Sequence, residues 1–247
     1  MPPTRPDADH RLRSFTPGGV EVLGAGHNAM GAWIWLAQTG RLPADRSTFA
    51  QEIGDDVLPV RVERPADGAA RVAMRQSPPR FLGRPGRADE LERVLGLAPG
   101  AVRRDVEAQV VSTGAGHLLV PVVRATAVDG AVPVPGDLRA FLAAAGAEGC
   151  YVFALTPERD DVTASARFFN PTVGIAEDPA TGTAAGPLAA LLVRLGLVEG
   201  TTVRIEQGRT MGRPSVLDVL VDGDVVELSG SGVLSAHGHL ELPDDAA

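Results

Sequence analysis

The sequence contains no lysine, because all 23 of its basic residues are arginine. Without a lysine amine the chain has no group for a Schiff base or for pyridoxal phosphate, and no phosphate-binding P-loop of the usual kind. The 31 acidic residues give a net charge of −8. This balance excludes the cationic surface that nucleic acids and anionic lipids require. We therefore expect a small-molecule partner, with neither nucleic acid nor membrane.

Cysteine is almost absent as well. The single Cys150 excludes an internal disulfide, and no Cys/His cluster has the spacing of a zinc site. No run approaches the roughly 18 apolar residues of a membrane-spanning helix, and Met1–His10 lacks the cationic and apolar parts of a leader. These absences predict a protein without a metal ion in the reducing cytoplasm.

Hydrophobic patterning predicts two similar halves. The first half has a buried helix at 29–38, a short helix at 88–96, a Gly/Pro-rich surface connection at 77–87 and strands at 11–16, 20–23, 56–64 and 69–76. The second half has helices at 137–145 and 183–195 and strands at 104–112, 117–124, 149–155, 162–169, 201–207, 215–221, 224–229 and 232–242. Each half is a set of antiparallel strands around one apolar helix, which indicates a duplicated unit.

A polar turn leads into each of the two central helices and carries ionisable side chains. His27 lies between Gly26 and Asn28 before the first helix, and Asp178 precedes the hydroxyl of Thr183 by five residues at the second. A helix start offers unpaired N–H groups and a partial positive charge, so two facing starts would suit a small carboxylate. The histidine and the aspartate could then move a proton between carbon atoms.

Each of these residues also has a purely structural interpretation. Asp178 before Pro179 is typical of a helix cap or turn, His27 of a hydrogen-bonded structural residue, and Thr183 of a capping hydroxyl. The GxG at Gly24–Gly26 lacks the third glycine and the βαβ setting of a dinucleotide site. His117, His237 and His239 are expected in strands without a special role, and Cys150 inside a strand.

Four stretches of the chain carry a family resemblance. Residues 177–188 (EDPATGTAAGPL) resemble the EDPATGSAxGPL signature of the PhzF family, the phenazine-biosynthesis-like isomerases related to diaminopimelate epimerase. Residues 15–31 (FTPGGVEVLGAGHNAMG) resemble the family's FTP…E…GHxTLG segment. Residues 111–122 (VSTGAGHLLVPV) resemble its STGxxHLLVPV strand pair, and 206–215 (EQGRTMGRPS) its QGxxMGRPS hairpin. Together these stretches span most of the chain.

The resemblance implies an α+β fold of two similar domains, 1–102 and 103–247, each a curled, mostly antiparallel sheet around a central helix. The last strand is expected to return to the first domain, and the active site to lie in the cleft between the two. By matching motifs, the resemblance gives catalytic places to Asp178, His27 and Thr183. The substrate-binding places fall to Gly26, Asn28, Gly182, Thr183 and Ala184, where the backbone of 182–184 would hold a carboxylate.

The sequence departs from the family in its first domain. The family's SETxF motif, whose glutamate is the principal acid/base, precedes the FTP segment, and Met1–His10 contains no glutamate. We therefore expect an incomplete first domain, in which Glu21 is an alternative base. A sheet lacking its first strands exposes an edge, which predicts a homodimer. The sequence Asn28-Ala29-Met30 also departs from the family and suggests a different substrate.

These features favour a cofactor-independent isomerase that shifts a proton along a small unsaturated or amino carboxylic acid in specialised-metabolite biosynthesis. A single base on one face favours double-bond migration over epimerisation, which normally needs groups on opposite faces. One alternative is a noncatalytic small-molecule-binding or scaffolding relative that has lost the glutamate. Another is a fragment of an ordinary family member whose gene begins upstream.

Overall fold

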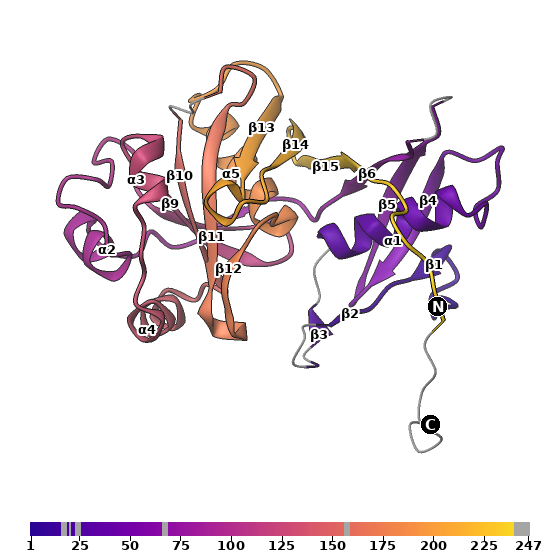
Figure 1. The fold of residues 1–247 in the computed structure, drawn as a ribbon, viewed down its shortest axis with the longest axis horizontal. Helices are drawn as coiled ribbons and strands as arrows, with labels where there is room; N and C mark the ends of the chain where they lie inside the picture. Colours follow the sequence, from indigo (N-terminus) through magenta and orange to yellow (C-terminus); the bar gives the residue numbers. More distant parts are fainter. Residues whose placement is uncertain (16–18, 20, 23–25, 66–68, 156–158, 240–247) are drawn as a thin grey trace.

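Among the described elements strands contribute more residues than helices, as the alternating pattern predicts, and the chain makes two lobes (Figure 1). The computed structural model describes residues 1–15, 19, 21–22, 26–65, 69–155 and 159–239. Gly24 of the GxG and the ends of the expected strands at 11–16, 20–23 and 232–242 lie outside these residues. The first lobe contains β1 (His10–Arg11), β2 (Ser14–Phe15), β3 (Glu21–Val22), α1 (His27–Gln38), β4 (Thr48–Ile53), β5 (Asp56–Glu63) and β6 (Arg71–Arg75).

The second lobe begins before the expected boundary between residues 102 and 103. Strand β7 pairs with β8, and helix α2 packs beside α4. The chain therefore passes from the first lobe to the second after β6 and before β7. The elements of this part are β7 (Arg80–Phe81), α2 (Ala88–Val94), β8 (Gln109–Ser112), β9 (Gly116–Pro121), α3 (Ala125–Asp129), α4 (Pro135–Ala145), β10 (Gly149–Ala154) and β11 (Ala164–Asn170). They continue with a short 3₁₀ helix (Pro171–Val173), β12 (Ile175–Asp178), α5 (Gly182–Arg194), β13 (Thr202–Gln207), a second 3₁₀ helix (Arg209–Met211), β14 (Ser215–Asp222) and β15 (Val225–Ser231).

One sheet of 13 described strands runs through both lobes. Its order is β1-β4-β5-β6-β15-β14-β13-β11-β10-β9-β8-β7, with β12 on β11, while β2 and β3 form a separate hairpin. Most neighbours are antiparallel, but β1 with β4, β9 with β10 and β11 with β13 are parallel. Strand β15 joins the lobes, because it pairs with β14 on one side and with β6 on the other.

The chain therefore returns to the first lobe through β15, which is earlier than the expected last strand at 232–242. Residues 232–239 form no strand in the part of the tail that the structure describes. They run back over α1, where the side-chain amide of Gln38 donates to the carbonyl of Gly232 at 2.9 Å. Figure 1 shows the described part of this tail crossing the first lobe, on the side of the molecule where the N-terminus lies.

The two central helices are buried to different extents. In α5, ten residues from Gly182 to Leu192 are buried, and the helix lies in a core that also takes in Trp33, Phe49 and Val60 of the first lobe. In α1 only Ala29, Trp33 and Ile34 are buried, and Trp35 is 41% exposed. The expected fully buried helix is therefore half-exposed here, because the strands of the first lobe cover one of its faces.

Two helical glycines test how tightly α5 is packed. A Cβ atom at Gly186 of α5 would lie 1.8 Å from Oε1 of Gln76 and 3.2 Å from Oγ1 of Thr113, whereas one at Gly31 of α1 meets nothing within 4 Å. Gly31→Ala should raise the free energy of unfolding by about 0.5–1 kcal/mol, because alanine loses less backbone entropy. Gly186→Ala should lower it by about 1–3 kcal/mol through overpacking. Urea unfolding measures both changes, and changes of the same sign would contradict this packing.

Candidate functional site

The starts of α1 and α5 meet at the boundary between the lobes. A Cβ atom at Gly182 would lie 3.6 Å from Cα of Gly26, and one at Gly26 would lie 3.7 Å from Cγ2 of Thr183. Neither helix has an acidic residue in its first turn or a side-chain cap. Among the described residues, the N–H groups of His27, Gly182 and Thr183 have no hydrogen-bond partner. Two uncapped helix starts therefore combine their partial positive charges here.

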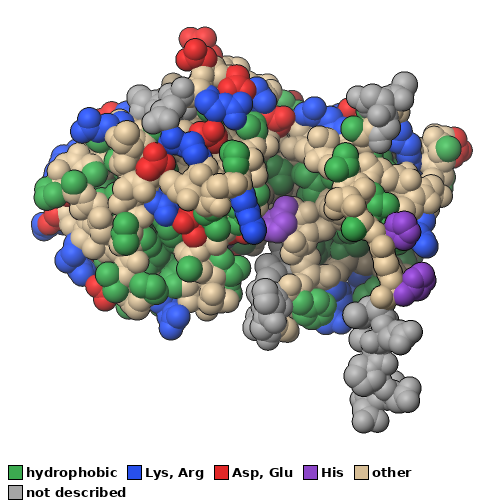
Figure 2. Space-filling view, viewed as in Figure 1, with side chains coloured by type: hydrophobic (Ala, Val, Ile, Leu, Met, Phe, Trp, Pro, Cys, Tyr) green, Lys and Arg blue, Asp and Glu red, His purple; other side chains and the backbone are tan. Residues whose placement is uncertain are grey.

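A cavity of about 240 Å³ opens beside these helix starts. His27 and Met30 of α1 line it together with Gly182 of α5, and β6, β14 and β15 supply Arg71, Asp218 and Ser229. Figure 2 shows the surface hollowed between the lobes, with a histidine side chain at the border. This cavity, which we call the interlobe cavity, is large enough for a small organic acid.

Asp178 ends β12 just before the turn into α5 and is half-buried. Its Oδ2 accepts a hydrogen bond from the hydroxyl of Thr181, and its backbone carbonyl accepts one from Nε2 of Gln207 at 2.6 Å. The pKa of the Tyr151 hydroxyl is raised, mainly by burial and to a smaller extent by the negative charge of Asp178. The carboxylate is thus held in place and affects its buried surroundings electrostatically.

Gln207 connects this carboxylate to the helix start. Its Nε2 also donates to Oγ1 of Thr181 at 3.0 Å, while its Oε1 accepts from the hydroxyl of Tyr151 at 2.8 Å and from the N–H of Thr181 at 3.1 Å. Since Nε2 can only donate, the Thr181 oxygen accepts there and its own proton goes to Asp178. The direction of this chain of hydrogen bonds is therefore fixed by Gln207.

A second buried glutamine holds α5 from the first lobe. Nε2 of Gln76 donates to the carbonyl of Gly182 at 2.8 Å, and its Oε1 accepts from the hydroxyl of Thr113 at 2.6 Å. The backbone N–H of Gln76 also donates to Val226 of β15 at 2.9 Å. The position of α5 is thereby fixed relative to both lobes.

An ion pair holds β12, and with it Asp178, against β11. Arg167 donates from Nε and Nη2 to the two carboxylate oxygens of Glu177, each at 2.8 Å. These side chains are only 12% and 17% exposed, and Nη1 donates further to the carbonyls of Asp129 and Ala131 at 2.8 Å. A bidentate pair of this kind restricts rotation as well as separation.

Thr183, the second residue of α5, contacts a histidine that we expected to have no special role. Its Oγ1 lies 3.3 Å from Nε2 of His117 on β9. His117 is fully buried, Phe168 packs edge-on against its ring at 5.0 Å, and its Nδ1 has no hydrogen-bond partner among the described residues. Burial lowers the pKa of His117 to about 4, so the imidazole is neutral near pH 7.

The expected site residues are only partly brought together. His27 and Gly182 line the interlobe cavity, with Gly26 and Thr183 in contact beside it. Asn28 is exposed in the first turn of α1. The N–H of Ala184 donates to the carbonyl of Thr181 at 3.1 Å, so this amide is engaged within the helix and differs from the free N–H groups that precede it.

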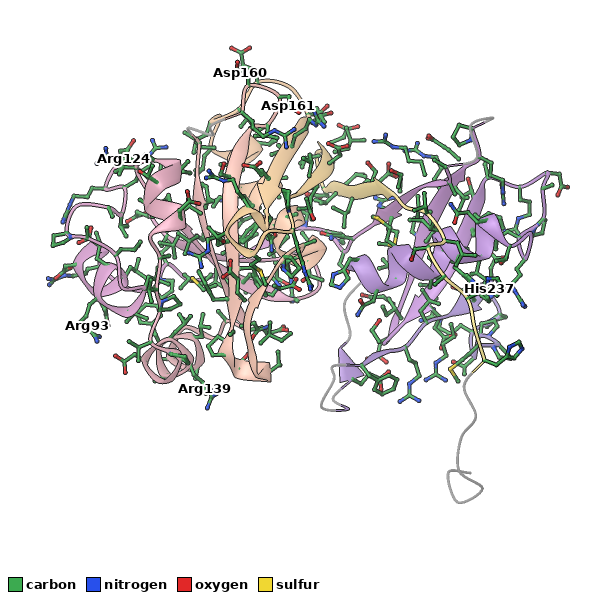
Figure 3. All side chains as sticks on the ribbon, in the orientation of Figure 1. Arg93, Arg124, Arg139, Asp160, Asp161 and His237 are labelled. Atoms are coloured by element: carbon green, nitrogen blue, oxygen red, sulfur yellow. The ribbon has the colours of Figure 1, made fainter. Side chains whose placement is uncertain are left out.

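Other candidates for acid/base or anion-binding roles are already paired or lie elsewhere. Glu21 accepts two hydrogen bonds from Arg13 at 2.8 Å, and this contact lowers the pKa of its carboxyl, which weakens it as a base. Arg209 pairs with Asp129 at 2.8 Å. His237 lies on the outer side of the first lobe, away from the lobe boundary (Figure 3).

The described residues include neither a metal-binding cluster nor a membrane-spanning helix. No group of three or more His, Cys, Asp or Glu side chains there could hold a metal ion. No helix in the same part of the chain is long and apolar enough to cross a membrane.

Comparison with known proteins identifies the family. The family model described as phenazine biosynthesis-like protein (PhzC-PhzF) matches residues 1–238, nearly the whole chain. This chain belongs to the PhzF family. The resemblance stated from the four sequence stretches is thereby confirmed.

The relatives of this PhzF-family chain are named as isomerases. An uncharacterized isomerase, YddE, from Escherichia coli O157:H7 is 30% identical over 243 residues, which cover 94% of this chain and 80% of the relative. The trans-2,3-dihydro-3-hydroxyanthranilate isomerase of Pseudomonas chlororaphis is also 30% identical, over 95% of this chain and 80% of its own length. These relatives support the isomerase class.

A solved structure confirms the fold class. A predicted epimerase from Pseudomonas aeruginosa superimposes with a TM-score of 0.77 at 29% identity, covering 96% of this chain and 83% of that one. The α+β, epimerase-like architecture inferred from the sequence is therefore the one this PhzF-family chain adopts.

The structure also adds residues to those expected from the sequence of this PhzF-family chain. His117 and Gln207 lie in stretches 111–122 and 206–215, and Thr181 lies in the signature. The motifs that contain these residues are visible in the sequence. Their contacts are not, because they join residues as distant as 66 positions along the chain. Gln76 and Tyr151 lie outside all four stretches, and nothing in the sequence analysis marked them.

The buried His117 predicts a loss of stability in acid. In the unfolded chain the imidazole binds a proton below its ordinary pKa of 6.5, whereas in the folded chain it does so only near pH 4. The unfolded state then holds more protons, so the free energy of unfolding should fall by about 3 kcal/mol as the pH drops from 6.5 to 4. Urea unfolding across this range should show a smaller fall for His117→Gln. Parallel curves for the two proteins would contradict the assignment.

Proposed function

We propose that this PhzF-family protein is a cofactor-independent isomerase that moves a proton between two carbon atoms of a small unsaturated or amino carboxylic acid. The observation that carries the proposal is the placement of Asp178 at the end of β12, just before the turn into α5. The first N–H groups of α5 have no partner among the described residues, and the start of α1 meets this helix start. An acidic group bound to these N–H groups would lie close to a carboxylate able to take up a proton.

The reaction would need only one proton and no net change in composition. Asp178 removes a proton from a carbon next to the double bond, the electron pair of that C–H bond shifts along the unsaturated system, and the protonated carboxyl returns the proton to a different carbon. His27 at the cavity wall is the second proton-handling group, and Thr183 hydrogen-bonds the acidic group of the substrate. A single base working on one face gives double-bond migration rather than epimerisation.

The relatives suggest the chemical class of substrate. The name trans-2,3-dihydro-3-hydroxyanthranilate describes a cyclic, unsaturated amino carboxylic acid, and its isomerase from Pseudomonas chlororaphis is similar to this chain. A substrate of the same class, in specialised-metabolite biosynthesis, agrees with a cavity of about 240 Å³ that is lined by both polar and apolar groups.

Two further parts of the proposal concern the setting of the protein. The lone, buried Cys150 agrees with a reducing cytoplasm. A homodimer agrees with the exposed face of α1, but β1 covers part of the sheet edge that first suggested it, through pairing with β4 at two positions. The molar mass in solution tests the dimer, and a strictly monomeric chain would contradict it.

Deuterium incorporation tests the proton shift. The protein is incubated in heavy water with trans-2,3-dihydro-3-hydroxyanthranilate and with metabolite extracts of its source organism, and products are analysed by mass spectrometry. We expect a converted or deuterium-labelled acid. For Asp178→Asn we expect the labelling rate to fall by about a hundredfold or more, because general acid–base groups contribute at least this much.

The matched control is Asp160→Asn, the same chemical change at an exposed loop position far from the helix starts (Figure 3). It should label as fast as the unmodified protein. Equal labelling by Asp178→Asn would remove Asp178 from the reaction. No labelling by any form would favour the noncatalytic, small-molecule-binding alternative.

A further inference from the structure

Among the described residues, the buried ring of His117 has one hydrogen-bond partner. Its Nε2 faces Oγ1 of Thr183 at 3.3 Å, and its other ring nitrogen, Nδ1, is buried without a partner in the part of the chain that the structure describes. The ring is fixed on its remaining sides, since Phe168 packs edge-on against it and a Cβ atom at Gly149 would lie 3.3 Å from Nδ1. These contacts restrict reorientation of the ring.

This arrangement decides which nitrogen carries the proton. A neutral imidazole has one N–H donor and one acceptor nitrogen. If Nδ1 carried the proton, the protein would bury an N–H donor without an acceptor, which is rare in folded proteins and costs more than an unused acceptor. With the proton on Nε2, the ring donates to Thr183, and only the lone pair of Nδ1 stays unused.

We propose that His117 is a positioning residue that donates its Nε2–H to Oγ1 of Thr183 and so directs the Thr183 hydroxyl proton toward an ionised carboxylate of the ligand. The inference rests on the proposed function, because the carboxylate is that of the proposed substrate. It goes further by naming the residue that makes Thr183 a donor and by requiring an acceptor-only group on the ligand.

The chemistry of the neighbouring groups agrees with an ionised carboxylate. The Thr183 hydroxyl would add a third donor to the unpaired N–H groups of Gly182 and Thr183 at the same helix start. An ionised carboxylate accepts at both oxygens and donates nothing, which matches the three donors at the start of α5. Gln207 directs the Thr181 hydroxyl toward Asp178 in the same manner, so two adjacent hydroxyls are each oriented by a buried donor.

The tautomer of His117 is measured on the unmodified protein. Nitrogen-15 NMR of the imidazole at neutral pH distinguishes a proton on Nε2 from one on Nδ1. We expect the Nε2–H form. The Nδ1–H form, or a charged ring, would overturn the proposal, whatever the result of the deuterium experiment.

Ligand binding tests the effect on Thr183. Anthranilate serves as the carboxylate probe, and 2-aminobenzamide as its uncharged control. His117→Leu and Thr183→Val should each weaken anthranilate binding about tenfold, because each removes a hydrogen bond that acts on a charged group. The double variant should bind no more weakly than either single one. His117→Gln keeps an N–H near the position of Nε2 and should stay within about threefold of the unmodified protein.

The outcomes separate this inference from the proposed function. Additive losses in the double variant, no difference between the Leu and Gln variants, or equal binding of the amide would overturn the role of His117. Failure of the unmodified protein to bind anthranilate would overturn the carboxylate assignment. Failure of deuterium labelling, together with Thr183-dependent anthranilate binding and the Nε2–H form, would remove the isomerase and leave a carboxylate-binding site positioned by His117.

Discussion

The side-chain amide of Gln207 uses all four of its hydrogen-bonding positions at the start of α5, and the site depends on this one group. It hydrogen-bonds the carbonyl of Asp178 and the N–H and hydroxyl of Thr181, and the hydroxyl of Tyr151 fixes its orientation by donating to Oε1. Because Gln207 is fully buried, each of these bonds would leave an unsatisfied polar atom if it broke. The carboxylate and the helix start are therefore fixed together as one unit.

The two lobes contribute different parts of the site. The second lobe supplies the rigid part, since α5 is almost entirely buried and is held by Gln207. The first lobe supplies His27 on a helix that is half-exposed, and it reaches α5 through the buried amide of Gln76. We infer that the carboxylate-binding geometry belongs mainly to α5, while the lobe carrying His27 determines which ligands fit beside it.

Sequence reasoning predicted the regular parts of the fold well. The helix at 183–195 and the hairpin at 56–64 and 69–76 lie within a few residues of α5, β5 and β6, because their hydrophobic periods are strong. Strand β4 was not predicted, since its Gln51 and Glu52 are polar yet buried. Their partners, Trp33 and Thr4, are distant in sequence. Strand β12 was read as part of a turn, because the ion pair with Arg167 that holds it is also nonlocal.

The same limit applied to the site. Asp178, His27 and Thr183 were chosen from local motifs, and their catalytic roles stay predictions; the structure shows that the starts of α1 and α5 lie close together. His117 was assigned no role because a strand histidine carries no local signal of a partner on another element. The engaged N–H of Ala184 could not be foreseen either, since it depends on a tight first turn at Thr181.

The central claim is that the facing helix starts bind a carboxylate, and backbone amide NMR during titration with anthranilate tests it most directly. The account predicts that the largest shifts fall on Gly182, Thr183 and His27, with much smaller shifts for 2-aminobenzamide. A larger open cavity of about 490 Å³ lies beside Arg103 and Arg104 in the second lobe. Shifts centred on those arginines, with the helix starts unmoved, would contradict the account.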